Sequence, residues 1–303
     1  MFSRKRVEMK NNSAISTAAI AAKEYIHACR SGSCDEMPAP WRVQVDDNRH
    51  VGMSFNPKEY HPYLIVGRAA ADSHAGLDLK YGASLLRHGF STRFGTGLIA
   101  GASQALGVGL NMPIYTECDA SYLEEAIVFL ARELDRLEGG ADIGTAFPRL
   151  QDTMYMGEAD ASAGVRRDFE RLAASCGIEM QPGDMLHFEV LFGDLPGRIS
   201  LHPLNRHVIA DFFLADARGM EDLQYQEIIK NALLINQQSL LGHSYSIGLA
   251  DTRLIACTGR RALEKLDDDA WPAWLQYHVA QARSTRALIH KVGMLGLEIN
   301  FSC

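Results

Sequence analysis

The sequence contains one short pattern twice, 146 residues apart, and this repeat constrains the fold more than any other feature. Ser54–Val66 reads Ser-Phe-Asn-Pro-Lys-Glu-Tyr-His and then an apolar run, and Ser200–Leu214 reads Ser-Leu-His-Pro-Leu-Asn-Arg-His and then another. Ser, Pro and His therefore recur at the same offsets. A pair of adjacent leucines also recurs, at a shift of 148 residues: Leu85, Leu86, Leu233 and Leu234. Repeats that keep their order along the chain predict two copies of one domain.

A chain of 303 residues is long enough for two domains, and half of it can bury a core of its own. In each half the hydrophobic pattern predicts a helix, three strands, a helix, two strands and a helix. Short turns rather than helical crossovers join the strands, so the predicted fold class is α+β with antiparallel sheets. The predicted division is a flexible tail at 1–12, a first domain at 13–140, a linker at 141–160 and a second domain at 161–303.

Charge and cysteine usage narrow the class of protein. The formal net charge of −7 is divided into −1 on residues 1–150 and −6 on residues 151–303, which gives no basis for nucleic-acid binding. No apolar run approaches the ~18 residues that a membrane span needs. The six cysteines are dispersed and form no CxxC pair, which is typical of a reduced, cytoplasmic protein.

Several patterns of the second half occur together in a known family. A helix over Val165–Ile178 contains a glycine near its end, Ala232–Gln237 reads Ala-Leu-Leu-Ile-Asn-Gln, and Arg253–Cys257 leads through Leu266–Asp269 into a final helix. In this order they resemble the CesT-like class I chaperones of bacterial type III secretion. The first half resembles the same family more faintly.

Proteins of this family are usually homodimers of single domains that hold the N-terminal segment of a secreted effector in extended form. The resemblance therefore implies a non-enzymatic, cytoplasmic chaperone without a cofactor, whose two domains form an intramolecular pseudodimer. It implies a secreted effector as partner and the secretion-system ATPase as a candidate second partner. The predicted interface between the domains places Leu85 and Leu86 against the region of Leu233 and Leu234.

The predicted effector-binding surface is the outward face of the first hairpin in each copy, because an extended peptide can add to a sheet edge. Its residues are Val43, Val45, Met53, Phe55, Phe188, Val190, Ile199 and Leu201. The competing interpretation is that these positions form the core, since alternation alone does not say which face of a strand is buried. For any single one of these residues the core interpretation is favoured.

The run Gly97–Gly109 points to a different class of function. Its glycines resemble the phosphate-binding turn of short-chain dehydrogenases, which predicts an NAD(P)-dependent oxidoreductase as the alternative. The run does not open a βαβ unit, Pro113 would interrupt a following helix, and no tyrosine has a lysine four residues later. A glycine-rich hairpin that corresponds to Ser244–Cys257 is therefore favoured. A regulatory scaffold of the secretion system is a third alternative.

The remaining polar motifs predict structure rather than chemistry. His202 and His207 flank a turn without a third ligand in view, so no metal site is predicted. His61 and His207 stand at the same place in the two copies, which indicates a role in the turn. Asp119 and the acidic run Asp267–Asp269 are predicted to cap the last helix of each half.

Overall fold

The structure is a computed structural model in which twelve stretches of the chain are described. They are residues 2–31, 41–56, 61–68, 79–93, 97–103, 107–114, 117–138, 161–180, 186–202, 206–242, 245–251 and 253–295. The predicted linker at 141–160 lies outside them.

The first half has the predicted order of elements. It comprises α1 (Phe2–Arg30), β1 (Trp41–Gln44), β2 (Arg49–Asn56), β3 (His61–Arg68), α2 (Leu79–Ser91), β4 (Ile99–Ser103), β5 (Gly107–Pro113) and α3 (Ala120–Glu138). Its five strands form an antiparallel sheet in the order β1-β2-β3-β5-β4.

The second half repeats this order. It comprises α4 (Ala161–Ser175), β6 (His187–Phe192), β7 (Leu195–His202), β8 (His207–Asp216), α5 (Asp222–Gly242), β9 (Tyr245–Leu249), β10 (Leu254–Ala262), a short 3-10 helix (Leu263–Lys265) and α6 (Ala270–Leu295). Its sheet has the equivalent order β6-β7-β8-β10-β9, again antiparallel. The predicted α+β class with two similar antiparallel halves is confirmed.

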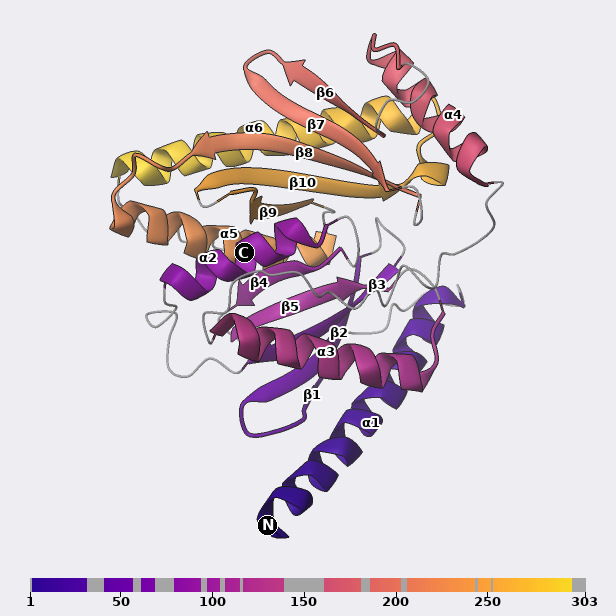
Figure 1. Ribbon diagram of the computed structural model, residues 1–303, viewed down its shortest axis with the longest axis vertical. Coiled ribbons are helices and arrows are strands. Elements are labelled where there is room, and N and C mark those ends of the chain that lie inside the picture. Colours follow the sequence, from indigo (N-terminus) through magenta and orange to yellow (C-terminus); the bar gives the residue numbers. More distant parts are fainter. Residues whose placement is uncertain are drawn as a thin grey trace.

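The two sheets lie one above the other with helices between them and outside them (Figure 1). α6 covers the far face of the second sheet through β8, and α1 and α3 cover the far face of the first sheet through β2 and β3. α2 and α5 lie between the sheets. Each sheet therefore packs one face on its own outer helices and turns part of the other face toward the opposite half.

The repeated histidines mark the same point in both sheets. His61 is the first residue of β3 and pairs with Asn56, and His207 is the first residue of β8 and pairs with His202. Each histidine thus begins the third strand of its half.

The N-terminal prediction needs a correction. α1 begins at Phe2 rather than at Ser13, so most of the stretch predicted as a flexible tail continues the helix. The stretch contains neither glycine nor proline and is rich in arginine, lysine, glutamate and methionine, which all favour helix. Its polarity suggested a tail, although polarity and helix propensity are separate properties.

Asp119 and Asp267 cap the last helices as predicted. The Tyr122 amide donates to Asp119 Oδ1 at 2.7 Å, and the Ala270 amide donates to Asp267 Oδ1 at 2.7 Å. These carboxylates satisfy amides that have no partner within the helix, and their negative charge lies at the positive end of the helix dipole.

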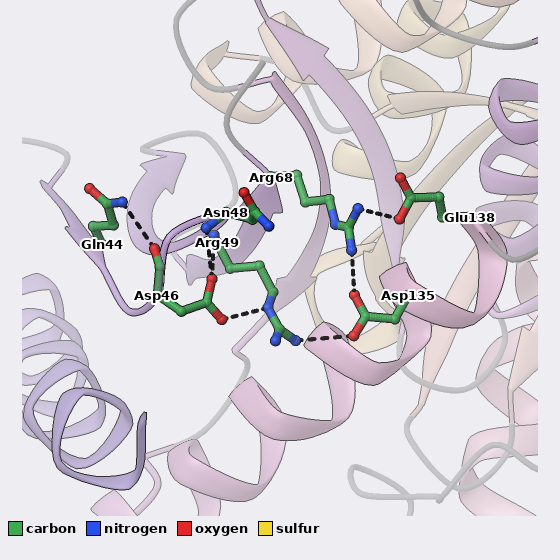
Figure 2. A network of polar contacts seen from close by, with 7 residues as sticks. All are labelled: Gln44, Asp46, Asn48, Arg49, Arg68, Asp135 and Glu138. Carbon is green, nitrogen blue, oxygen red and sulfur yellow. Dashed lines mark hydrogen bonds and ion pairs between the residues drawn. The ribbon is translucent and has the colours of Figure 1, made fainter. Parts of the chain in front are cut away.

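An ion network ties the first hairpin to α3 (Figure 2). Arg49 bonds both Asp46, at 2.8 Å, and Asp135, at 3.2 Å. Arg68 bonds Asp135 at 2.9 Å and also pairs with Glu138. The side chains are partly exposed, so each pair contributes at most about 1 kcal/mol, but together they fix the hairpin against the helix.

The second half makes the same connection with the charges reversed. Here the helix supplies the cations: Arg283 of α6 donates to the Phe192 carbonyl at 3.1 Å, and Arg286 donates to the Asp194 carbonyl at 3.0 Å. Arg286 also pairs with the Asp194 carboxylate. The two halves have kept one architecture while their surface charges diverged.

A buried histidine makes the second half sensitive to acid. His278 of α6 is fully buried, and its ring packs against the backbone of Gly259 and lies 4.5 Å from the Trp274 ring, centroid to centroid. Burial, with a smaller contribution from the Arg261 charge, lowers the pKa of His278 to about 3. Burial likewise lowers the pKa of His50 to about 4. Both imidazoles are therefore neutral in the folded protein.

We expect the free energy of unfolding to fall between pH 6.5 and pH 5. The unfolded imidazole binds a proton near pH 6.5 while folded His278 stays neutral, so acid favours the unfolded chain by about 2 kcal/mol at pH 5 from this residue alone. Denaturant titrations of the wild type and His278→Leu at pH 7.5 and pH 5 measure this. The variant should lose less stability over the interval, and equal losses would contradict the assignment.

Candidate functional site

The two halves meet where each central helix lies on the edge strand of the other half. α5 contacts β4 of the first sheet, and α2 contacts β9 of the second sheet. Both contacts occur at a glycine. A Cβ on Gly101 would lie 2.9 Å from Gln237 Oε1, and a Cβ on Gly248 would lie 2.8 Å from Phe90 Cβ. The missing side chains let helix and strand approach closely.

One buried side chain serves both edge strands at this junction. The Asn236 amide nitrogen of α5 donates to the Ala100 carbonyl of β4 at 2.7 Å and to the Ile247 carbonyl of β9 at 2.8 Å. Its carbonyl oxygen accepts from the Ile247 amide at 2.6 Å. Asn236 therefore bonds backbone groups from both halves.

A buried ion pair also crosses the junction. Arg93, which follows α2, donates from Nε to both oxygens of Asp211 on β8, at 2.9 Å and 3.1 Å. The Thr258 hydroxyl donates to the same carboxylate at 2.7 Å, and Arg260 donates to the Arg93 carbonyl at 2.9 Å. Burial raises the pKa of Asp211, and the Arg93 charge and the bond from Thr258 oppose that rise.

The hydrophobic pattern did not predict this ion pair, although the sequence contains a signal for it. Asp211 is the one charged residue inside the apolar run Val208–Leu214. An aspartate within a strand whose neighbours are all apolar needs a partner if the strand is buried. The partner lies 118 positions away along the chain, so the pattern could reveal the need but not the arginine.

The leucines predicted for the interface lie on the two helices that face each other. α2 and α5 are in contact. Leu85, Leu86 and Leu233 are buried, and Leu234 is half-buried. Their role in holding the halves together stays a prediction.

The predicted effector-binding residues do not lie on an outward face. Met53, Phe188, Ile199 and Leu201 are buried in the core. Val45, Phe55 and Val190 are half-buried and pack against it, and half-buried Val43 pairs with buried Val51. The core interpretation, which was favoured for any single residue, therefore holds for the buried positions, because the apolar set of a strand covered on one face packs against the covering helices. Binding of a partner by these residues stays untested.

The outer edges of the sheets offer a different binding surface. β1 and β6 are the terminal strands, and each has a neighbour on one side only. The Leu201 amide donates to the Leu186 carbonyl, so alternation along the antiparallel ladder directs the amides and carbonyls of Glu189 and Leu191 away from β7. The Glu189 side chain is 72% exposed and Leu191 is 70% exposed. β6 therefore presents backbone hydrogen-bonding groups to solvent.

β1 has the same property in the first half. The Val45 amide donates to the Arg49 carbonyl, so Arg42 and Gln44 direct their backbone groups away from β2. Both residues are exposed.

The glycine-rich run forms the favoured hairpin. β4 and β5 are antiparallel, with Gly101 opposite Gly109, and Pro113 belongs to β5, where it pairs with Tyr63. No helix follows β4 to direct amides at a pyrophosphate, so the run lacks the geometry of a dinucleotide turn.

In the described part of the chain, two cysteine thiols are held protonated and the acidic residues form no metal site. Burial raises the pKa of Cys118 to about 11 and also raises the pKa of Cys257, so both thiols stay protonated at neutral pH. Within the described ranges, no three His, Cys, Asp or Glu residues are grouped to hold a metal ion. In those ranges no helix is both long and apolar enough to cross a membrane.

Fold and site together define an α+β protein with two similar, closely joined halves, in which β1 and β6 end the two sheets. No family model and no curated protein matches the sequence. Two solved structures are similar to part of it. One is a chain in a structure of the ExsC–ExsE complex, with 14% sequence identity and a TM-score of 0.35. The match covers 42% of this chain and 95% of that chain. The other is a chain in a structure of the HopA1–SchA chaperone–effector complex, with 15% sequence identity and a TM-score of 0.34. The match covers 43% of this chain and 99% of that chain.

Gly248→Val should weaken the junction. The added methyl groups collide with the Phe90 side chain and the Leu86 carbonyl, so we expect a loss of about 1–3 kcal/mol in the free energy of unfolding. Gly164→Ala is the control, because nothing lies within 4 Å of that position and alanine in α4 should stabilise by about 0.5–1 kcal/mol. Chemical denaturation measures both, and a neutral Gly248→Val would contradict the close approach.

Asp211→Asn should destabilise the protein by about 3–5 kcal/mol, because it leaves the Arg93 charge in a buried position without its counter-ion. The double variant Arg93→Met, Asp211→Leu should be more stable than the sum of the single changes predicts. A denaturation double-mutant cycle tests this. Strict additivity would show that the two side chains do not interact.

Proposed function

We propose that this protein is a cytoplasmic, non-enzymatic chaperone of type III secretion that binds the N-terminal segment of a secreted effector and keeps it extended. The observation that carries the proposal is the free β6 edge, with exposed Glu189 and Leu191 and outward backbone groups. The CesT-like pattern of Val165–Ile289 and the duplicated topology support it.

The mechanism is strand addition. An extended segment of the client pairs with β6, and its amides and carbonyls bond those of Glu189 and Leu191. Backbone pairing is tolerant of sequence, and the side chains beside the edge supply selectivity. The client segment is thereby held away from its own chain, and no bond is made or broken. β1 offers the corresponding edge in the first half.

In this proposal the two halves act as a pseudodimer. Linking two modules in one chain replaces a bimolecular association with a high effective concentration. The crossing of α2 and α5 over β9 and β4 supports this arrangement. The secretion-system ATPase stays a predicted partner, and a regulatory scaffold is the outcome if the protein binds components of the secretion system but no client.

Leu191→Pro should abolish most client binding without unfolding the protein. Proline removes the outward amide, whereas the inward ladder with β7 uses the neighbouring residues. We expect a loss of about tenfold in affinity, since each backbone hydrogen bond contributes about 1 kcal/mol and the ring also blocks the approach of a strand. Leu191→Ala is the matched control, because it shortens the side chain and keeps the amide.

The measurement is recovery of bound protein from the native cell under secretion-inducing conditions, followed by titration with the recovered N-terminal segment. Failure to recover any secreted protein would refute the proposed function. Equal affinity of Leu191→Pro and Leu191→Ala would refute strand addition to β6. A saturable fluorescence change with NADH or NADPH would favour the oxidoreductase alternative instead.

A further inference from the structure

The two central helices are unequal, and this inequality leaves one groove open. α2 has 13 residues and α5 has 21. With the repeat shift of 148, the last residue of α2, Ser91, corresponds to Ser239, and α5 continues to Gly242. α5 also contacts β2 of the opposite sheet. Among the described residues, α2 makes no comparable contact with β7, which is the counterpart of β2.

The surface that α2 leaves uncovered is a pocket of about 560 Å³. One wall is the end of α2, the floor is β7 and β8, and the far end is the turn after β9. Its main lining residues are Arg87, Phe90, Arg93, Arg198, Phe213 and Leu249. With the strand shift of 146, Arg198 and Phe213 stand where the first half has Gly52 and Gly67. The second half thus has large side chains where the covered groove has none.

Two of the arginines keep hydrogen-bonding capacity for a ligand. Nε of Arg87 and Nε of Arg198 are buried and have no hydrogen-bond partner among the described residues. Within the described stretches, Arg87 donates a long bond, 3.5 Å, to the Ser84 hydroxyl, and Arg198 pairs with the exposed Glu189 carboxylate at 2.9 Å. Only the Nε atoms are buried, since the Arg198 side chain as a whole is 42% exposed. A buried N–H without an acceptor is costly, and a carboxylate that enters the pocket can accept from Nε and a terminal nitrogen of one guanidinium in bidentate geometry.

The other charges limit what the pocket can hold. Arg93 is already neutralised by buried Asp211, and Asp251 places one carboxylate at the far end of the lining. Arg198 already pairs with Glu189, and the charge of Asp251 also acts on Arg218. The charge of Arg87 therefore leaves room for one negative group rather than a run of them. Phe90 and Phe213 add apolar surface beside the arginines.

We propose that this pocket, lined by Arg87, Arg198, Phe90 and Phe213, binds a peptide segment in which a single Asp or Glu lies next to large apolar side chains. The carboxylate bonds the two guanidinium groups, and the apolar neighbours pack on the phenylalanine rings. This inference rests on the proposed function for its biological ligand, an acidic–apolar stretch of the client beyond the part that pairs with β6. The binding chemistry itself is independent of secretion.

The direct test uses three synthetic peptides, acetyl-Gly-Ser-Leu-Glu-Leu-Ser-Gly-amide and its Gln and Lys counterparts. Arginine Nε–H signals of ¹⁵N-labelled protein are followed by NMR, with Arg87→Gln and Arg198→Gln identifying the two signals. The Glu peptide should shift both signals saturably, and either variant should weaken its binding at least tenfold. The Gln and Lys peptides should bind at least tenfold more weakly than the Glu peptide.

Arg167→Gln is the matched control, because Arg167 is exposed on α4 and does not belong to the pocket lining. It should leave peptide binding unchanged, and thermal denaturation verifies that each variant is folded. Equal binding of the Glu and Gln peptides, or no shift of either arginine signal, would overturn the proposal.

A second measurement separates this proposal from the proposed function. If the Glu peptide binds as expected but no secreted protein is recovered from cells, the chaperone function fails and the pocket chemistry stands. If a client is recovered and binds the Arg87→Gln, Arg198→Gln double variant as tightly as the wild type, the pocket is not part of client recognition and the biological assignment is overturned.

Discussion

The structure depends on closing two inner sheet edges with helices from within the same chain. β4 and β9 end their sheets where the halves meet, and an open edge presents unpaired amides and carbonyls. Asn236 supplies an amide that bonds Ala100 on one edge and Ile247 on the other. The glycines at 101 and 248 let the helices come close enough for this. In the part of the chain that the structure describes, β1 and β6 pair with a strand on one side, so the fold that closes the inner edges leaves the outer edges available for pairing.

The two halves have the same order of helices and strands, but their polar contacts differ. In both halves polar contacts join the first hairpin to the last helix. In the first half the arginines lie on the strands, and in the second half they lie on α6. The Arg93–Asp211 pair, by contrast, has no equivalent on the other side, because Ile65 stands at the position of Asp211. Architecture is therefore set by the apolar pattern and by backbone geometry, and the charges are secondary to it.

The sequence predicted the topology because topology follows from patterns that are local. Alternation over Leu186–Phe192, the turn before His207 and the caps at Asp119 and Asp267 each specify a few residues of backbone, and both halves contain the same series. The sequence did not decide which face of each strand is buried, because alternation is symmetric until a covering helix is placed. The buried ion pair and the pocket were beyond prediction because they join α2 of one half to β7 and β8 of the other. Contacts at such separations depend on how the halves dock.

Joining the two modules in one chain has a structural consequence that a homodimer could not have. In a symmetric dimer every groove occurs twice, so a helix that covers one groove covers its mate as well. Here α5 extends to Gly242 and contacts β2. α2 ends at Ser91 and, among the described residues, makes no comparable contact with β7. One half can therefore stabilise the junction while the other keeps a pocket lined by Arg87 and Arg198. Such a difference between the halves requires each half to have its own sequence, which a single chain with two similar halves provides.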